Sequence, residues 1–206
     1  HEIIQYAIKL KQVEFIEHCP IEQFNIVNGK VQSIRSQNKQ IYFADQFVIT
    51  TGAWSKHWSE QLDLDIPVQP VQGQMVLFKT PENWLPTMCM NKVMYLIPRL
   101  DGHVVCGSSM ANCGFDTTPT AATKQTILEA CFEMVPELAA FPIVKQWAGL
   151  RPSSPTGVPY IGKMPELDNL WANFGHFRNG LCMGPASARL LRQLIVTYES
   201  RLYQPL

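Results

Sequence analysis

The sequence predicts an α+β fold, because short strand patterns occupy most of the chain and helical patterns are few. The dipeptide Asn28-Gly29 separates two alternating runs within residues 24–34, which is a strong hairpin signal. Helical spacing of apolar residues covers three segments: residues 3–11, 120–135 and 181–198. With 206 residues and 46% hydrophobic content, the chain is able to bury a core as one or two domains.

The first quarter of the chain is predicted to hold a helix followed by short strands. The helix at residues 3–11 precedes a strand at residues 13–16, and the hairpin comes next. Two further strands are expected at residues 41–43 and 46–50. The apolar run from Val48 ends at Gly52, and such strand ends commonly face a ligand in α/β sheets.

From His57 onward, prolines punctuate the chain and the predicted strands are longer. Pro119-Thr120 starts a helix at residues 120–135, and Pro136 ends it. Asp101-Gly102 is a good turn between two of the strands. The predicted strands are residues 72–79, 93–97, 103–107, 144–150 and 169–174, and the helix at residues 181–198 closes the chain.

Charge and hydropathy exclude two classes of partner. The chain has 17 basic and 17 acidic residues, so its formal net charge is zero, whereas nucleic-acid binding favours a basic patch. No apolar run approaches the roughly 20 residues that a membrane-spanning helix needs. We therefore expect neither nucleic acid nor a membrane as a partner.

The cysteines and histidines predict reduced thiols and no metal site. None of the cysteines forms a Cys-x-x-Cys pair, and a disulfide framework is not expected in a chain this long and apolar. The five histidines are scattered, without the spacing of metal ligands. We therefore expect a cytoplasmic protein. The six cysteines are Cys19, Cys89, Cys106, Cys113, Cys131 and Cys182.

Two arginine motifs near the C-terminus point to a small anionic substrate. Arg151 lies in the segment Trp147–Pro152, and Arg178 lies in the segment Gly175–Leu181. Each arginine stands among apolar residues and close to glycine. An arginine fork donates two parallel hydrogen bonds to a planar carboxylate. The alternative for either residue is a surface charge or a structural ion pair.

These motifs resemble the glycine oxidase and D-amino-acid oxidase family of flavoproteins, and the resemblance runs from about residue 10 to residue 198. Members of that family open with a strand, a Gly-x-Gly-x-x-Gly turn and a helix that holds the cofactor pyrophosphate. No such pattern occurs among the 12 glycines of this sequence. The chain therefore resembles the C-terminal part of such a flavoenzyme. Three further stretches carry the resemblance: Thr51–Ser55, Val71–Gln74 and Tyr95–Arg99.

The resemblance implies how the predicted elements assemble. Residues 1–55 would form part of an FAD-binding domain, and residues 56–145 would form a substrate-binding domain built on an antiparallel sheet. Residues 146–206 would return to the FAD-binding domain. The expected fold is thus an antiparallel-sheet substrate domain plus an incomplete α/β FAD-binding domain.

The resemblance also assigns four residues to a substrate site. Arg151 would anchor the substrate carboxylate, and the hydroxyl of Tyr95 would donate to the same group. Met110 would line the pocket, and Arg178 would lie close to both substrate and flavin. The structural alternatives are a buried tyrosine with a satisfied hydroxyl for Tyr95 and plain core filling for Met110.

The expected cofactor site has three parts. Ile21 would contact the adenine end of FAD through its backbone, the alternative being an ordinary strand residue. Thr51 and Gly52 would lie where the apolar strand ends. A loop at the start of the closing helix would face the isoalloxazine, with backbone N–H groups and a positive helix end. That loop comprises His176, Phe177, Arg178, Asn179, Gly180, Leu181 and Cys182; we expect Cys182 to be a small buried residue and the flavin to be non-covalent.

The implied activity is FAD-dependent oxidative deamination of glycine, sarcosine or a small D-amino acid. Hydride would pass from the substrate Cα to flavin N5, and oxygen would reoxidise the flavin. No side chain stands out as a general base, which agrees with a protein that mainly positions its substrate. We therefore assign no catalytic residue.

Two other interpretations remain open. The chain could be a non-enzymatic subunit or fragment that binds a partner chain. It could also keep the fold and act on another substrate, since relatives of the family act on modified tRNA bases or produce cyanide from glycine. We expect the present chain alone to lack FAD and to be inactive. It would associate with itself or with a missing N-terminal FAD segment.

Overall fold

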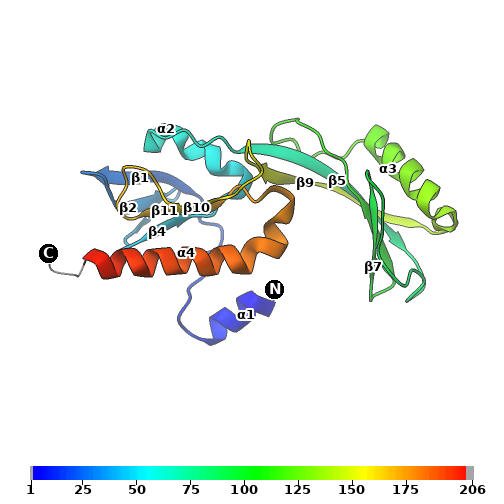
Figure 1. The fold of residues 1–206 in the computed structure, drawn as a ribbon, viewed down its shortest axis with the longest axis horizontal. Helices are drawn as coiled ribbons and strands as arrows, with labels where there is room; N and C mark the ends of the chain where they lie inside the picture. Colours follow the sequence, from blue (N-terminus) through cyan, green and yellow to red (C-terminus); the bar gives the residue numbers. More distant parts are fainter. Residues whose placement is uncertain (1, 203–206) are drawn as a thin grey trace.

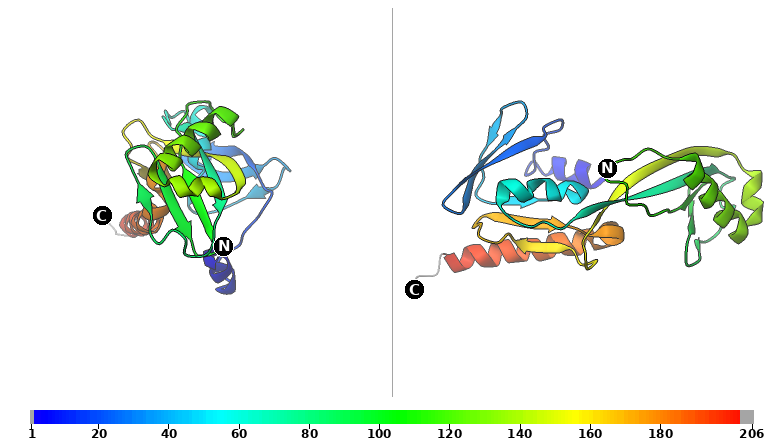
Figure 2. Two further views of the ribbon diagram at one scale, coloured as in Figure 1. Left: turned by 90° about the vertical axis from the view of Figure 1, so that its right-hand side faces the viewer. Right: turned by 90° about the horizontal axis from the view of Figure 1, so that it is seen from above.

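Two eleven-residue strands, β5 (Gln69–Lys79) and β9 (Ile143–Ser153), run side by side from the middle of an elongated molecule into one end of it (Figure 1). The computed structural model describes residues 2–202. The other end holds the strands within residues 21–49 and 160–174, and the long helix α4 (Gly180–Leu202) lies along it. Figure 2 shows the same elongation from above.

The end reached by β5 and β9 is an antiparallel sheet of five strands, in the order β6-β7-β8-β5-β9. The three remaining strands are β6 (Cys89–Met90), β7 (Tyr95–Arg99) and β8 (His103–Gly107). The helix α3 (Ala121–Met134) covers one face of this sheet, followed by the short η2 (Pro136–Ala140). The side chain of Thr120 caps α3 by accepting a hydrogen bond from the N–H of Thr123. The expected antiparallel sheet is therefore confirmed.

The second sheet has three strands and mixed direction. β11 (Leu170–Phe174) lies between β4 (Phe47–Ile49), to which it is parallel, and β10 (Tyr160–Lys163), to which it is antiparallel. α4 contacts β10 and β11. On the other side of β4, no strand pairs with it among residues 2–202. The 3-10 helix η1 (Gly52–Trp58) and α2 (Ser59–Leu62) connect this sheet to β5.

The third sheet is the predicted hairpin with one added strand. β1 (Ile21–Val27) and β2 (Lys30–Ser36) flank a two-residue turn, and β3 (Ile41–Tyr42) pairs with β2. Asn28 and Gly29 both have positive φ, as the hairpin turn requires. The side-chain amide of Asn169 bonds both the N–H and the carbonyl of Val31, and it also donates to the carbonyl of Asp45. This amide therefore fastens the hairpin to the second sheet.

The sequence predictions differ from the structure in several places, and β6, η1 and α2 are among the elements that were not predicted. Residues 13–16 form no strand, because no other strand in the described chain pairs with them. β10 was not predicted, since it is short and lies between Pro159 and Pro165. β9 continues beyond Leu150 to Ser153, so Arg151 lies inside the strand. Pro152 is tolerated there because β9 is the edge strand of its sheet.

The N-terminal helix α1 (Glu2–Lys9) is confirmed, but none of its residues is buried. Its apolar side chains and those that follow it are exposed. These exposed residues are Ile3, Ile4, Tyr6, Ile8, Leu10, Val13, Phe15 and Ile16. In a folded protein, the apolar face of such a helix normally packs against another surface. Among residues 2–202, no such surface covers it.

Candidate functional site

The two faces of the five-stranded sheet differ sharply. Residues directly opposed in antiparallel strands point to the same face, and successive residues alternate between faces. Val76, Phe78 and Leu96 point toward α3 and are fully buried. The pairs Gly73–Gly149, Met75–Trp147 and Tyr95–Gly107 define the other face. This second face, called here the open face, carries Gly73, Met75, Tyr95, Gly107, Trp147, Gly149 and Arg151.

The guanidinium of Arg151 lies on the open face, directly over Gly73. Its Nη1 donates to the carbonyl of Ser109 at 3.2 Å, and its Nη2 donates to the hydroxyl of Ser108 at 2.6 Å. A Cβ atom added to Gly73 would lie 2.2 Å from Nη1. Within residues 2–202, no carboxylate forms an ion pair with Arg151. The half-buried positive charge thus has only neutral oxygen partners in the described chain.

The segment that holds Arg151 is the loop at residues 108–120, which joins β8 to α3. Backbone groups of Gln72 and Ala111 exchange two hydrogen bonds. The N–H of Gln74 donates to the hydroxyl of Ser109, and the N–H of Ser109 donates to the carbonyl of Gln74. Further along, the N–H of Thr120 donates to the side-chain oxygen of Gln74. Because both glutamines are buried, the loop is anchored to β5 along its length.

Tyr95 and Met110 lie beside this loop. Tyr95 is opposite Gly107, the residue that directly precedes Ser108, so the structure brings Tyr95 and Arg151 to one face of one sheet. The Tyr95 hydroxyl forms no hydrogen bond with any described residue, unlike a buried structural tyrosine. The side chain of Met110 is 61% exposed, so it does not fill the core. Both side chains are therefore free to meet a ligand.

Arg178 approaches the site from the other sheet. Arg178 is exposed in the 3-10 helix η3 (Phe177–Asn179). His176, the residue before η3, forms an antiparallel β-bridge with Ser153 at the end of β9. No ion pair of Arg178 occurs in the described part of the chain. η3 also contacts β9. Arg178 is thus carried toward the Arg151 end of β9, although no bond joins the two arginines.

Two buried polar atoms lack partners where β9 meets η3. The Nε2 atom of His176 and the hydroxyl of Ser154 are buried and form no hydrogen bond with described residues. The desolvation that comes with burial lowers the pKa of His176, so its imidazole is neutral at pH 7. Buried polar groups are normally satisfied. A water molecule or a polar ligand would satisfy these two atoms.

Ile21 and Thr51 line one cavity. It has a volume of about 680 Å³ and lies between the hairpin and β4. Phe47, Trp54 and Leu170 contribute apolar walls. Gly52 follows with a positive φ of 56°, and a Cβ there would meet nothing within 4 Å. The structure therefore brings two of the predicted cofactor residues together at an open site and places Gly52 directly after Thr51.

The remaining predicted cofactor residues belong to the start of α4. Phe177, Asn179 and Gly180 lie in η3 and at the first position of α4, and Leu181 is 93% exposed. The expectation that Cys182 is buried is wrong, because it projects from the first turn of α4 and is exposed. This exposed turn offers backbone N–H groups to a ligand.

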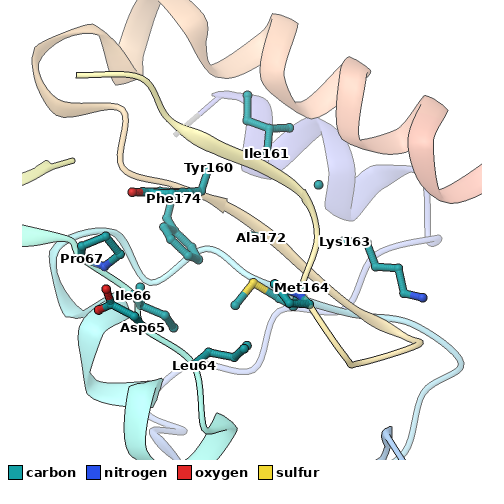
Figure 3. Close-up of a pocket in the computed structure, with 12 residues that line it drawn as sticks. Leu64, Asp65, Ile66, Pro67, Tyr160, Ile161, Lys163, Met164, Ala172 and Phe174 are labelled. Carbon is teal, nitrogen blue, oxygen red and sulfur yellow. The ribbon is translucent and has the colours of Figure 1, made fainter. Parts of the chain in front are cut away.

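A separate cavity of about 300 Å³ lies between β10 and the segment that joins α2 to β5 (Figure 3). Leu64, Ile66, Met164 and Phe174 gather around it, while Lys163 points away (Figure 3). None of the predicted site residues lines it. We therefore do not place the functional site there.

Sequence reasoning missed the residues that hold Arg151. Gly73 and Gln74 stood in a recognised motif, but the sequence assigned them no role. Ser108 and Ser109 follow a predicted strand, and nothing in their spacing signals contact with a residue more than 40 positions away. A glycine within an apolar strand was the one available signal, since such glycines often mark close approach of another group.

The described residues hold neither a cluster of metal ligands nor a membrane-spanning helix. Within residues 2–202, no three His, Cys, Asp or Glu side chains are grouped so that they could hold a metal ion. Over the same residues, no helix combines the length and the apolar character needed to cross a membrane. All six cysteines are free thiols.

Comparison with known sequences identifies relatives over most of the chain. A family model described as FAD dependent oxidoreductase (DAO) matches residues 3–194. The glycine oxidase of Pseudomonas putida is 43% identical over 192 residues, which make up 93% of this chain and 52% of that protein. The glycine oxidase of Pseudomonas aeruginosa is 48% identical over 151 residues, or 73% of this chain and 42% of that protein.

Comparison with solved structures agrees. The crystal structure of glycine oxidase from Bacillus cereus matches with a TM-score of 0.88 at 26% identity, covering 95% of this chain and 54% of that one. The match supports the expected fold, a helix-and-antiparallel-sheet arrangement of the kind seen in glycine oxidase. This chain spans about half the length of the relatives that it matches.

Proposed function

The chain belongs to the DAO family of FAD-dependent oxidoreductases, and from that premise we propose that the complete protein oxidises a small amino acid. The substrates would be glycine, sarcosine or a small D-amino acid. One observation carries the proposal: the guanidinium of Arg151 is fixed on the open face with no anionic partner in the described chain. A substrate carboxylate would supply that partner.

The chemistry of Arg151 suits this role. A half-buried charge is costly unless an opposite charge or several hydrogen bonds compensate it. Ser108 and Ser109 occupy two of its nitrogens, and the fork has further N–H donors for a carboxylate. A charge-assisted pair of this kind is short and geometrically specific. Arg151 would therefore set both the affinity and the orientation of the substrate.

The other substrate residues would complete the contact. The free hydroxyl of Tyr95 would donate a second kind of hydrogen bond to the carboxylate. Met110 would cover the apolar side of the substrate, because its exposed side chain extends from the loop at residues 108–120. Arg178 would add positive charge from the start of α4. None of these three residues would transfer a proton.

The residues present fit FAD. Ile21 would contact its adenine end through the backbone, Thr51 and Gly52 would contact the cofactor where the apolar strand ends, and the segment from His176 to Cys182 would face the isoalloxazine. The unpartnered His176 Nε2 and Ser154 hydroxyl support a polar ligand beside this segment. When bound without a covalent link, FAD would accept the hydride from the substrate Cα, and oxygen would reoxidise it. The chain's own residues would bind and orient the substrate for that transfer.

The division of the chain follows from this arrangement. We place residues 1–55 and 146–206 in the FAD-binding domain and residues 56–145 in the substrate-binding domain. One cluster of buried apolar residues lies around β4 and β11, and the other lies between α3 and the five-stranded sheet, so the chain has two cores. The first core also includes Trp58, Leu62, Ile66 and Val68 from residues 56–145. Residues 1–206 alone would bind FAD weakly, because none of their glycines forms the pyrophosphate-binding pattern.

Six free cysteines are consistent with the cytoplasm, where we place the protein.

The direct test uses the complete protein, purified with its flavin. Mixing it with glycine, sarcosine or D-alanine without oxygen should bleach the flavin absorption, and air should restore it with release of peroxide. A matched amine without a carboxylate, methylamine, should react far more slowly. If none of the three amino acids bleaches the flavin, the proposed function is wrong.

A second candidate is a chain that acts by binding a partner chain. The exposed apolar stripe of α1 and the unpaired edge of β4 favour it, because such surfaces tend to pair. We expect residues 1–206 produced alone to self-associate, and light scattering would detect a dimer. A strict monomer at high micromolar concentration would count against this candidate.

A further inference from the structure

We propose that Gly73 and Ser108 are positioning residues that together fix the guanidinium of Arg151, and so set the affinity of the site for a carboxylate. This inference rests on the proposed function, since it takes Arg151 to be the carboxylate anchor. Neither residue would touch the substrate. Each would act only through Arg151.

Gly73 is needed for space and not for backbone conformation. Its φ lies outside the positive range that favours glycine, so any residue could adopt its backbone. A Cβ there, however, would lie 2.2 Å, 2.3 Å and 2.4 Å from the Nη1, Nη2 and Cζ atoms of Arg151. The guanidinium therefore occupies the volume that a side chain at residue 73 would fill.

The glycine directly opposite gives a matched comparison. Gly149 pairs with Gly73 across β5 and β9, and it also lacks a positive φ. A Cβ at Gly149 would meet nothing within 4 Å. The two paired glycines thus differ in whether Arg151 fills the space above them: Gly73 is buried in the interior strand β5, and Gly149 is exposed in the edge strand β9.

Ser108 fixes the rotation of the fork. Its hydroxyl accepts a hydrogen bond from Nη2 of Arg151 at 2.6 Å, and the neighbouring carbonyl of Ser109 accepts one from Nη1 at 3.2 Å. Because the two nitrogens bond adjacent residues, the guanidinium plane cannot turn without breaking one bond. Gln74 holds Ser109 in place through two hydrogen bonds. The acceptors are thus anchored before any ligand arrives.

The expected cost of substitution follows from what must move. A Cβ at residue 73 would displace only the end of a flexible side chain, so Gly73→Ala should leave the fold intact. The guanidinium would shift by an ångström or more. Misplacement on the order of 1 Å in a positioned group costs up to about a hundredfold.

The experiment measures the dissociation constant of glycolate, a carboxylate without the reacting amine, from its effect on the flavin absorption of the complete FAD-bound protein. Gly73→Ala should weaken glycolate about tenfold to a hundredfold with an unchanged melting temperature. Gly149→Ala should change it by less than about threefold, because its Cβ meets open space. Ser108→Ala should also weaken glycolate, and Ser108→Thr, which keeps the hydroxyl, should restore it.

The decisive arm repeats Gly73→Ala in an Arg151→Ala background, where no further loss should appear. If Gly73→Ala weakens glycolate binding equally in both backgrounds, the positioning role is overturned and the proposed function stands. The same holds if Gly73→Ala leaves glycolate binding unchanged while Arg151→Ala weakens it. An Arg151→Ala protein that binds glycolate as well as the unaltered one, or an unaltered protein that does not bind it, would overturn the proposed function and this inference with it.

Discussion

The two faces of the five-stranded sheet are built from alternate residues of the same strands, yet they have opposite characters. The face under α3, called here the closed face, carries fully buried side chains such as Val76, Phe78 and Leu96. The open face has three glycines, Gly73, Gly107 and Gly149, and the guanidinium of Arg151 lies over the first of them. Alternation along a strand thus separates a surface that stabilises the fold from one that is free to bind.

The difference teaches where function can be placed at little cost in stability. Apolar burial stabilises the fold on the closed face, where large side chains are fully removed from water. The open face contributes less, so it can carry glycines and an uncompensated charge. Substitutions on the closed face should therefore change the free energy of unfolding, and substitutions on the open face should change substrate binding.

The largest effect expected on the closed face is a loss of stability. Leu96→Ala, at a fully buried site, should lower the free energy of unfolding by about 2–5 kcal/mol. Ile97→Ala, one residue further and 38% exposed, should change it by no more than about 1 kcal/mol. Thermal or urea unfolding of the complete protein makes the measurement. Equal losses at the two positions would contradict the assignment of the faces.

The largest effect expected on the open face is a loss of substrate affinity. Arg151→Ala should weaken binding of a carboxylate substrate by about 2–5 kcal/mol, because it removes one partner of a charged pair. Flavin content and melting temperature should stay near those of the unaltered protein. Steady-state kinetics with glycine and flavin absorption provide both readouts. Lost flavin with unchanged apparent affinity would show that Arg151 is not the anchor.

A smaller effect is expected from Tyr95→Phe, which removes only the hydroxyl. The loss should be about 1.5–3 kcal/mol with a substrate that bears a carboxylate, as for a hydrogen bond to a charged group. With methylamine, which has no carboxylate, the substitution should have no effect. Comparing kcat/KM for the two substrates makes the test. Similar losses for both would assign Tyr95 to packing.

The smallest effect is expected at Met110. Because its side chain is exposed, Met110→Ala should change stability by no more than about 0.5 kcal/mol. If Met110 lines the substrate pocket, the ratio of kcat/KM for D-alanine to that for glycine should shift by more than about twofold, since a methylene in a pocket changes selectivity. A ratio that stays constant would remove Met110 from the pocket.

Local signals predicted the elements that local chemistry determines. Asn28-Gly29 predicted the hairpin because both residues tolerate positive φ, and Thr120 predicted the start of α3 because its side chain caps the helix. The short β10 was missed because its pairing with β11, rather than its own composition, makes it a strand. The strand predicted at residues 13–16 failed for the converse reason, the lack of a partner.

The site was predicted only as far as family motifs reach. The arginine motif and the resemblance supplied Arg151, the resemblance alone supplied Tyr95, and the structure places both on the open face. The contacts that hold Arg151 come from residues brought together by the ladder of β5, β8 and β9, and such contacts leave no periodic trace in the sequence. Exposure of Cys182 was likewise beyond prediction, since it depends on what packs against α4.

One measurement tests the central claim most directly: a crystal structure of the complete, FAD-bound protein with glycolate. The account predicts a carboxylate oxygen within about 2.7–2.9 Å of a guanidinium nitrogen of Arg151, on the open face and beside Tyr95. Arg151 should still lie over Gly73. Glycolate bound elsewhere, with Arg151 contacting only Ser108 and Ser109, would contradict the account.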